Sequence, residues 1–255
     1  MMISELKKAG YKIKKSLSKR VLYFDKNYNY KNFYGTDCLA IFPELNVCFN
    51  RIKKSGNTST CAYLSEICGY PVSETTPEMK DRIKTPYDLG IAELFKLRNF
   101  HSLVVVRDPY ARALSTYLDK VAPGTNFLFA KCPGFGDRTA EGFLRFLKFL
   151  EVSGTKFDKH FWPQVDFLYQ PADRFSCVAK LESLTTDLGV FFESIGVQSE
   201  LRLSFDRPHP LEAAEPGKVT SAQKKLTQYY DVDCHRIVEE VYRADFDAFD
   251  YRINR

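Results

Sequence analysis

The chain has 255 residues, of which 44% are hydrophobic and 27% charged, and its formal net charge at pH 7 is +5. This composition is typical of a soluble globular enzyme, and the length suffices for one large domain with an enclosed core. No apolar run approaches the roughly 20 residues that cross a bilayer, and the start of the chain lacks the features of a secretory signal. We therefore expect a cytoplasmic protein.

The basic charge is concentrated in an N-terminal arm, which we assign to residues 1–35. Through Lys31 the chain has nine Lys or Arg and two Asp or Glu, a net of +7, which leaves −2 for the rest of the +5 chain. An enzyme of nucleic acid carries its basic surface on the folded body, so this distribution argues against nucleic acid as a partner. The arm is either a solvated basic helix or a surface that contacts an anionic membrane or an acidic glycan.

Seven cysteines are scattered along the chain, without a CxxC pair and without a His/Cys cluster at zinc spacing. An odd number with no framework indicates buried free thiols in a reducing compartment. We expect no metal site.

Residues 36–255 alternate strand, loop and helix and are interpreted as a single domain. A strand over 45–52 precedes a helix over 58–68, and a strand over 103–106 precedes a helix that begins near Asp108 and Pro109. A third strand, over 175–180, precedes a helix over 184–195, and further helices are predicted over 142–150 and 221–244.

This alternation predicts an α/β protein with a three-layer P-loop-like fold, in which helices cover both faces of a central parallel sheet. Ligands of such sheets bind where the carboxyl ends of the strands meet the N-termini of helices. The turns after the first two strands are therefore the candidate binding sites.

The first turn, from Lys54 to Ser59, has the composition of an anion cradle. Gly56 lets the backbone approach a phosphate because it has no Cβ, and the next helix offers free N–H groups at its start. Lys54 adds a charge, and Thr58 and Ser59 add hydroxyl donors. The ordinary alternative is a helix cap and turn. A Walker A loop is excluded, because its lysine follows the second glycine.

The second turn begins at Arg107, and Ser115 lies eight residues later in the following helix. A guanidinium at the end of a buried strand must either pair with a carboxylate or meet an anionic ligand. Arg107 therefore binds a ligand phosphate or pairs with a structural carboxylate such as Asp108.

The two turns in this order resemble the carbohydrate sulfotransferase family, in which Lys-x-Gly-x-Thr-Ser precedes Arg-Asp-Pro and a later serine. The resemblance spans roughly residues 45–251 and continues through three further segments: His160-Phe-Trp-Pro-Gln164, Lys180-Leu-Glu-Ser-Leu184 and Asp245-Phe-x-x-Phe-x-Tyr251. It implies transfer of a sulfuryl group from 3′-phosphoadenosine 5′-phosphosulfate (PAPS) to a hydroxyl of a carbohydrate, either a polysaccharide or a glycolipid.

The resemblance also implies which residues bind the donor. By this resemblance, Arg107 and Ser115 would bind the 3′-phosphate. The first turn would bind the 5′-phosphosulfate through Lys54, Ser55, Gly56, Asn57, Thr58 and Ser59. Golgi-type members that act on chondroitin or dermatan carry a membrane anchor and paired cysteines after the His-x-x-Pro-Gln stretch. This chain shows neither, so we expect a soluble, bacterial member.

Sulfuryl transfer requires stabilisation of charge on the leaving oxygen and a base for the acceptor hydroxyl. Lys54 is the candidate for the first task, and the transferred group, which is singly charged, requires no metal. His160 is the candidate base, and a structural or acceptor-orienting role is its alternative. Glu74 and Glu78 are possible substitutes. Trp162 either stacks on a sugar ring or belongs to the core.

Two other functions fit parts of the sequence. The strand that ends at Asp108 would serve as a Walker B strand in a P-loop-type nucleotide or small-molecule kinase, which would depend on magnesium. A non-catalytic binder of acidic glycan or membrane would depend instead on residues 1–30.

Overall fold

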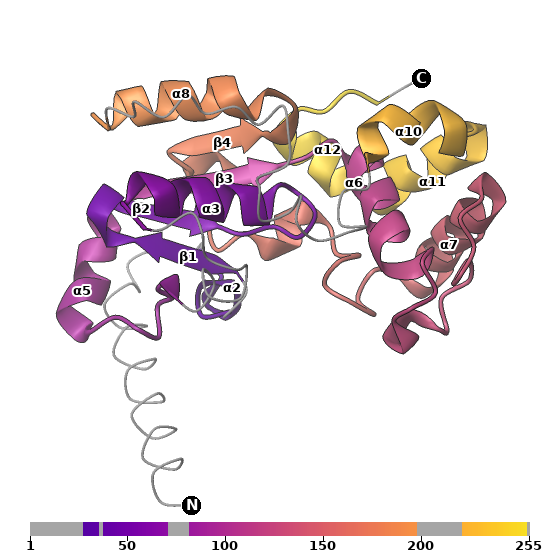
Figure 1. The fold of residues 1–255 in the computed structure, drawn as a ribbon, viewed down its shortest axis with the longest axis horizontal. Helices are drawn as coiled ribbons and strands as arrows, with labels where there is room; N and C mark the ends of the chain where they lie inside the picture. The colour runs from indigo at the N-terminus through magenta and orange to yellow at the C-terminus, as the bar shows by residue number, and fades with distance from the viewer. Residues whose placement is uncertain (1–27, 36–37, 71–81, 198–220, 254–255) are drawn as a thin grey trace, which may run out of the picture.

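A central sheet organises the fold. The computed structural model describes residues 28–35, 38–70, 82–197 and 221–253 (Figure 1). Within these residues the neighbouring strands are, in order, β1 (Leu39–Phe42), β2 (Val47–Asn50), β3 (His101–Val106) and β4 (Cys177–Lys180). Strands β2, β3 and β4 run parallel, which confirms the three predicted strand regions and their parallel pairing.

Strand β1 departs from the predicted all-parallel sheet, because it runs antiparallel to β2. A short 3₁₀ turn, Pro43–Leu45, joins the two strands, and Asn46 closes the turn in the left-handed conformation with a φ of 52°. A connection this short can only reverse the chain, since a parallel partner requires a crossover of a dozen or more residues. The predicted strand over 45–52 is therefore shorter, because its first residues belong to the turn.

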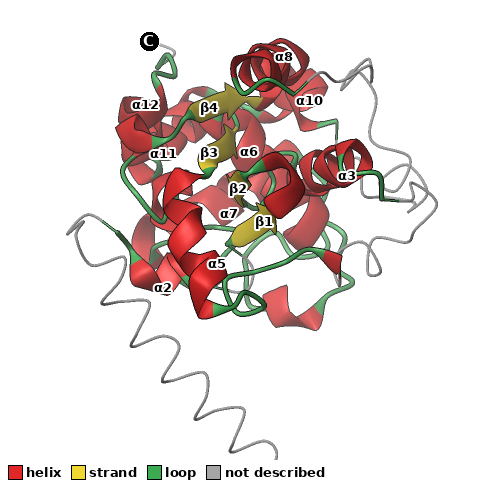
Figure 2. Ribbon diagram, turned by 90° about the vertical axis from the view of Figure 1, so that its left-hand side faces the viewer, coloured by secondary structure: helices red, strands yellow, loops and turns green. Residues whose placement is uncertain are grey.

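Helices cover both faces of the sheet, as the sequence predicts (Figure 2). One face packs against α3 (Asn57–Ile67) and α8 (Leu184–Ser194) through the buried side chains of Phe49, Leu103 and Val105. The alternate residues Val104 and Val106 point to the other face. That face packs against α2 (Tyr30–Phe33), α5 (Ile91–Lys96) and α12 (Arg243–Phe249).

A second group of helices lies beyond the carboxyl end of β3 (Figure 1). It consists of α6 (Pro109–Thr116), α7 (Ala140–Ser153), α10 (Ala222–Tyr229) and α11 (Val232–Val241), which share one apolar core. Every residue of α6 is buried. Polar side chains of α6 must therefore find partners inside the protein.

Residues 28–35, which the sequence groups with the basic arm, pack against the domain. The side-chain amide of Asn32 donates to the carbonyls of Asp166 (2.7 Å) and Leu168 (2.9 Å), and Phe33 is buried beside them. Residues 1–27 lie outside the described residues. The division of the chain at residue 35, and the contact of the arm with membrane or glycan, stay predictions.

The seven cysteines are free and five of them are buried, in agreement with the predicted free thiols. No helix in the described part of the chain is long and apolar enough to cross a bilayer. Across those same residues, no group of three or more His, Cys, Asp or Glu side chains is arranged to hold a metal ion.

Candidate active site

The turn between β2 and α3 has an unusual backbone. Gly56 is the N-cap of α3 with a φ of 68°, and Lys54 has a φ of 67°, a left-handed conformation that residues other than glycine rarely adopt. A Cβ on Gly56 would lie 2.7 Å from Cδ1 of Leu181, and together with the left-handed φ this close approach favours glycine. No side chain caps α3, which leaves the N–H groups of its first turn available to an anion.

The polar side chains of this turn divide between internal and outward roles. The hydroxyl of Ser55 donates to Oε1 of Gln164 (2.9 Å), and Oδ1 of Asn57 accepts from Nε of Arg51 (2.9 Å). Ser55 and Asn57 thus use their side chains inside the protein, and only their backbone N–H groups are left for an anion. Thr58 is half-buried and Ser59 is buried at the start of α3.

The second turn contacts the first through Arg107. Nη1 of Arg107 donates to the backbone carbonyl of Lys54 (3.2 Å). No carboxylate in the described parts of the chain forms an ion pair with Arg107, and the carboxylate of Asp108 instead caps α6 by accepting from Ala111 N (2.9 Å). Burial lowers the pKa of Arg107, and Glu182 opposes this shift only in part. An anionic ligand would offset the unfavourable effect of burial on the charged guanidinium.

Ser115, the other residue assigned to the 3′-phosphate, lies two turns into α6 and is buried. Arg107 and Ser115 thus flank the same helix, one at its start and one near its end. The carboxyl ends of β2 and β3 bring the two turns to one edge of the sheet, where the sequence predicts ligand binding.

A fully buried glutamine holds the two turns together. Oε1 of Gln164 accepts from the Ser55 hydroxyl and from the backbone N–H of Arg107, each at 2.9 Å, and Nε2 donates to the Arg107 carbonyl (2.7 Å). The backbone N–H groups of Gln164 and Val165 donate to the carboxylate of Asp245 at 2.8 Å and 3.0 Å. The segments that begin at His160 and Asp245, to which the sequence assigns no donor-binding role, therefore build the frame of the site.

Arg112 adds a second internal connection, which the sequence reasoning missed. It is 1% exposed, and it donates through Nε to the Lys53 carbonyl (3.0 Å) and through Nη1 to the Trp162 carbonyl (2.8 Å). Burial lowers its pKa, and the charge of Asp245 opposes that shift. An arginine between Ala111 and Ala113, in a helix whose other residues carry no charge, is the signal that would have revealed it.

His160 forms a pair with Asp158. Its Nδ1 lies 2.6 Å from Oδ1 of Asp158, which also accepts from the His160 backbone N–H (2.8 Å). The His160 carbonyl accepts from the hydroxyl of Thr116 on α6 (3.2 Å), which ties this segment to the second turn. Because Asp158 occupies Nδ1, the other ring nitrogen, Nε2, is the one left to contact a substrate. Glu74 and Glu78 lie outside the described residues.

The ammonium of Lys54 contacts Asp119, a residue that the sequence reasoning did not single out. Its Nζ lies 3.4 Å from Oδ2 of Asp119, and each side chain is 18% exposed. Burial lowers the pKa of Lys54, and Asp119 opposes that shift.

Trp162, predicted either to stack on a sugar or to belong to the core, is half-buried at the edge of the core. Its ring packs against Phe167 with the centroids 5.7 Å apart, and Nζ of Lys156 lies 4.6 Å from the ring centroid. Glu182 accepts from the backbone N–H of Asp108 (2.9 Å) and from the hydroxyl of Tyr251 (3.0 Å), so it connects the second turn to the C-terminal segment.

The family model described as "Sulfotransferase family" matches the chain from residue 38 to residue 252. This chain belongs to the sulfotransferase family. Neither the curated proteins nor the solved structures gave a match. The match covers both turns, the Gln164 frame and the His160–Asp158 pair of this sulfotransferase.

We predict that Gln164→Leu lowers the free energy of unfolding by about 2–4 kcal/mol, because the substitution leaves the buried hydrogen-bond partners of the amide unsatisfied. Chemical denaturation measures this change. Gln228→Leu, at an exposed position of α10, is the matched control and should change stability by less than about 0.5 kcal/mol. Equal stability of the two variants would contradict the role of Gln164.

Proposed function

We propose that this sulfotransferase moves the sulfuryl group of PAPS to a hydroxyl of a carbohydrate, either a polysaccharide or a glycolipid. One observation carries the proposal: the guanidinium of Arg107 lies against the backbone of Lys54, with no carboxylate of the described residues paired to it. The two anion-binding turns thus form one site for a ligand with two separated anionic groups. PAPS is such a ligand.

The residues present fit the donor. On the 5′ side, the uncapped N-terminus of α3 and the glycine at Gly56 suit close approach of an anion. On the 3′ side, Arg107 supplies a charged donor that the fold leaves without an ion-pair partner among the described residues. When bound, the donor supplies an activated sulfuryl group.

Lys54 and His160 divide the chemistry. The Lys54 ammonium neutralises negative charge at the leaving oxygen, a stabilisation that is strong in a partly buried site. Nε2 of His160 accepts the proton of the attacking hydroxyl, while Asp158 at Nδ1 orients the ring and stabilises its charged form. Because the sulfuryl group carries a single charge, the proposal assigns its stabilisation to protein cations and not to a metal.

The alternative of a P-loop-type kinase receives no support from the site. A Walker B aspartate would have to face a magnesium ion, but the carboxylate of Asp108 caps α6 and its backbone N–H is bound by Glu182. We base the carbohydrate acceptor on the sequence resemblance. A cytoplasmic location is proposed because the chain lacks the paired cysteines of the Golgi-type members.

We predict that Arg107→Ala weakens the binding of 3′-phosphoadenosine 5′-phosphate, the desulfated donor, by roughly 1.5–3 kcal/mol, about 10- to 150-fold in Kd. The loss reflects a charged hydrogen bond to the 3′-phosphate. Calorimetric titration in EDTA measures it, and Arg138→Ala, at an exposed position, is the control. Absence of binding to the wild-type protein would refute the proposed donor site.

We predict that Lys54→Ala lowers the turnover rate by about 10²- to 10³-fold, as expected for loss of one transition-state donor. The measurement is transfer of labelled sulfate from PAPS to an acceptor found by screening polysaccharides and glycolipids. Lys148→Ala, exposed on α7, should retain the wild-type rate. A near-wild-type rate for Lys54→Ala would remove Lys54 from the mechanism.

We predict that His160→Gln loses about 10²- to 10⁴-fold in turnover, the usual contribution of a general base. Calorimetric binding of the desulfated donor should stay unchanged in this variant, because His160 acts on the acceptor. A variant that transfers sulfate at the wild-type rate would assign the base role to another residue.

A further inference from the structure

A π-helical turn follows α6. It spans Tyr117–Val121, and the N–H of Ala122 donates to the carbonyl of Tyr117 (2.9 Å), five residues earlier. Such turns are rare and often occur at functional sites, because the extra residue redirects the side chains that follow it. Here the redirected side chains are charged.

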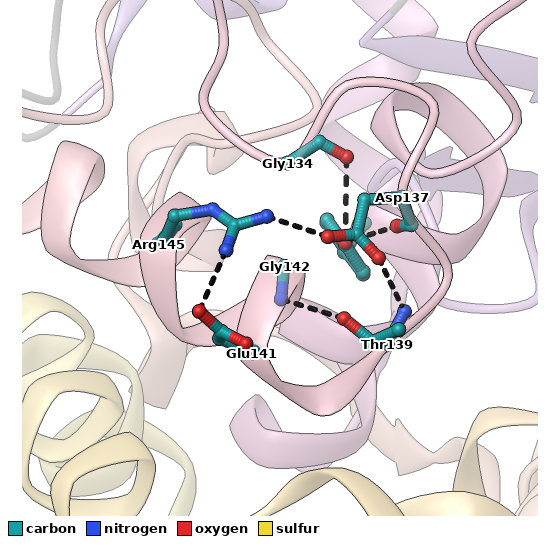
Figure 3. Close-up of polar contacts among 7 residues, drawn as sticks. Gly134, Asp137, Thr139, Glu141, Gly142 and Arg145 are labelled. Atoms are coloured by element: carbon teal, nitrogen blue, oxygen red, sulfur yellow. Dashed lines mark hydrogen bonds and ion pairs between the residues drawn. The ribbon is translucent and has the colours of Figure 1, made fainter.

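A polar network fixes the start of this turn. The hydroxyl of Tyr117, a fully buried residue, donates to the carbonyls of Gly134 and Asp137. The carboxylate of Asp137 accepts from the backbone N–H of Thr139 (2.8 Å) and pairs with Arg145 of α7 at 2.5 Å (Figure 3). The loop before α7 and α7 itself therefore hold the π-helical turn in place.

The turn delivers Asp119 to the candidate lysine. Oδ2 of Asp119 lies 3.4 Å from Nζ of Lys54 and 2.9 Å from Nζ of Lys120. Within the described residues, Asp119 is the only carboxylate that pairs with Lys54. The contact joins the first turn to the helix that follows the second turn.

The charges around Lys54 make this contact important. Burial lowers the pKa of Lys54, and the nearby cations Lys120 and Arg107 lower it further. Asp119 is the group that raises the pKa of Lys54. Burial alone would raise the pKa of Asp119, but the two lysines outweigh it and hold that pKa below its usual value, so the carboxylate stays ionised beside them.

We propose that Asp119 is a positioning residue for sulfuryl transfer, whose carboxylate holds the Lys54 ammonium in place. This inference rests on the proposed role of Lys54. Asp119 acts through Lys54 and accepts no proton from the acceptor. Without the charge of Asp119, the pKa of Lys54 would fall, because burial and the cations Lys120 and Arg107 would act on it unopposed.

The first test measures the charge of Lys54 directly. In the absence of substrates, the pH dependence of Lys54 labelling by an amine-reactive anhydride, read by mass spectrometry, reports its pKa. Asp119→Asn should move this profile to lower pH by about one unit or more, the usual effect of a neighbouring opposite charge. Lys120→Met should move it to higher pH, because Lys120 lowers the pKa of Lys54.

The second test follows kcat/KM against pH. Transfer requires protonated Lys54, so activity falls as pH rises through its pKa. Asp119→Asn should show this fall at lower pH, and Asp119→Glu should restore the wild-type profile. Glu240→Gln, at an exposed ion pair away from this network, should leave the profile unchanged. Desulfated donor should still bind to Asp119→Asn.

The outcomes separate this inference from the proposed function. An Asp119→Asn labelling profile identical to the wild type, or an equal rate loss at every pH, would overturn the role of Asp119. A shifted labelling profile in a protein that binds no desulfated donor would support the Asp119–Lys54 contact and refute the donor site.

Discussion

The candidate site depends on the buried side-chain amide of Gln164. An amide removed from water must satisfy both its oxygen and its nitrogen. Here the oxygen accepts from both turns, and the nitrogen donates to the second turn. The position of Gln164 is itself set by Asp245, which binds two successive backbone N–H groups. Four distant parts of the chain are thus fixed relative to one another before any ligand is present, as a preorganised anion site requires.

Arg112 reinforces this frame at a cost. Its guanidinium is enclosed with the charge of Asp245 near it, but Nη2 has no hydrogen-bond partner among the described residues. A buried cation is retained at such a cost where its geometry specifies one arrangement of its partners. Here the partners are the backbone on both sides of the site, at Lys53 and Trp162.

The site combines cations and carboxylates in a defined pattern. Arg107 has no ion-pair partner among the described residues, Lys54 shares Asp119 with Lys120, and His160 is paired with Asp158. Each cation or base with a catalytic task in the proposal thus has a fixed orienting group. The cation assigned to the 3′-phosphate has none, because the ligand would supply the opposite charge.

The sequence by itself determined the parallel strands, most of the helices and the places of the two strand-to-helix turns, because these follow from local periodicity, caps and glycine placement. It also pointed to Lys54, Arg107 and His160 by their residue types and order. The antiparallel strand β1 was missed, because the short run 39–42 contains one β-branched residue, whereas the predicted strand over 103–106 contains three valines. Only the tertiary structure decided the roles of Gln164, Arg112 and Asp119. Their partners lie from tens to more than a hundred residues away in the chain, and long-range hydrogen bonds leave no local pattern in sequence.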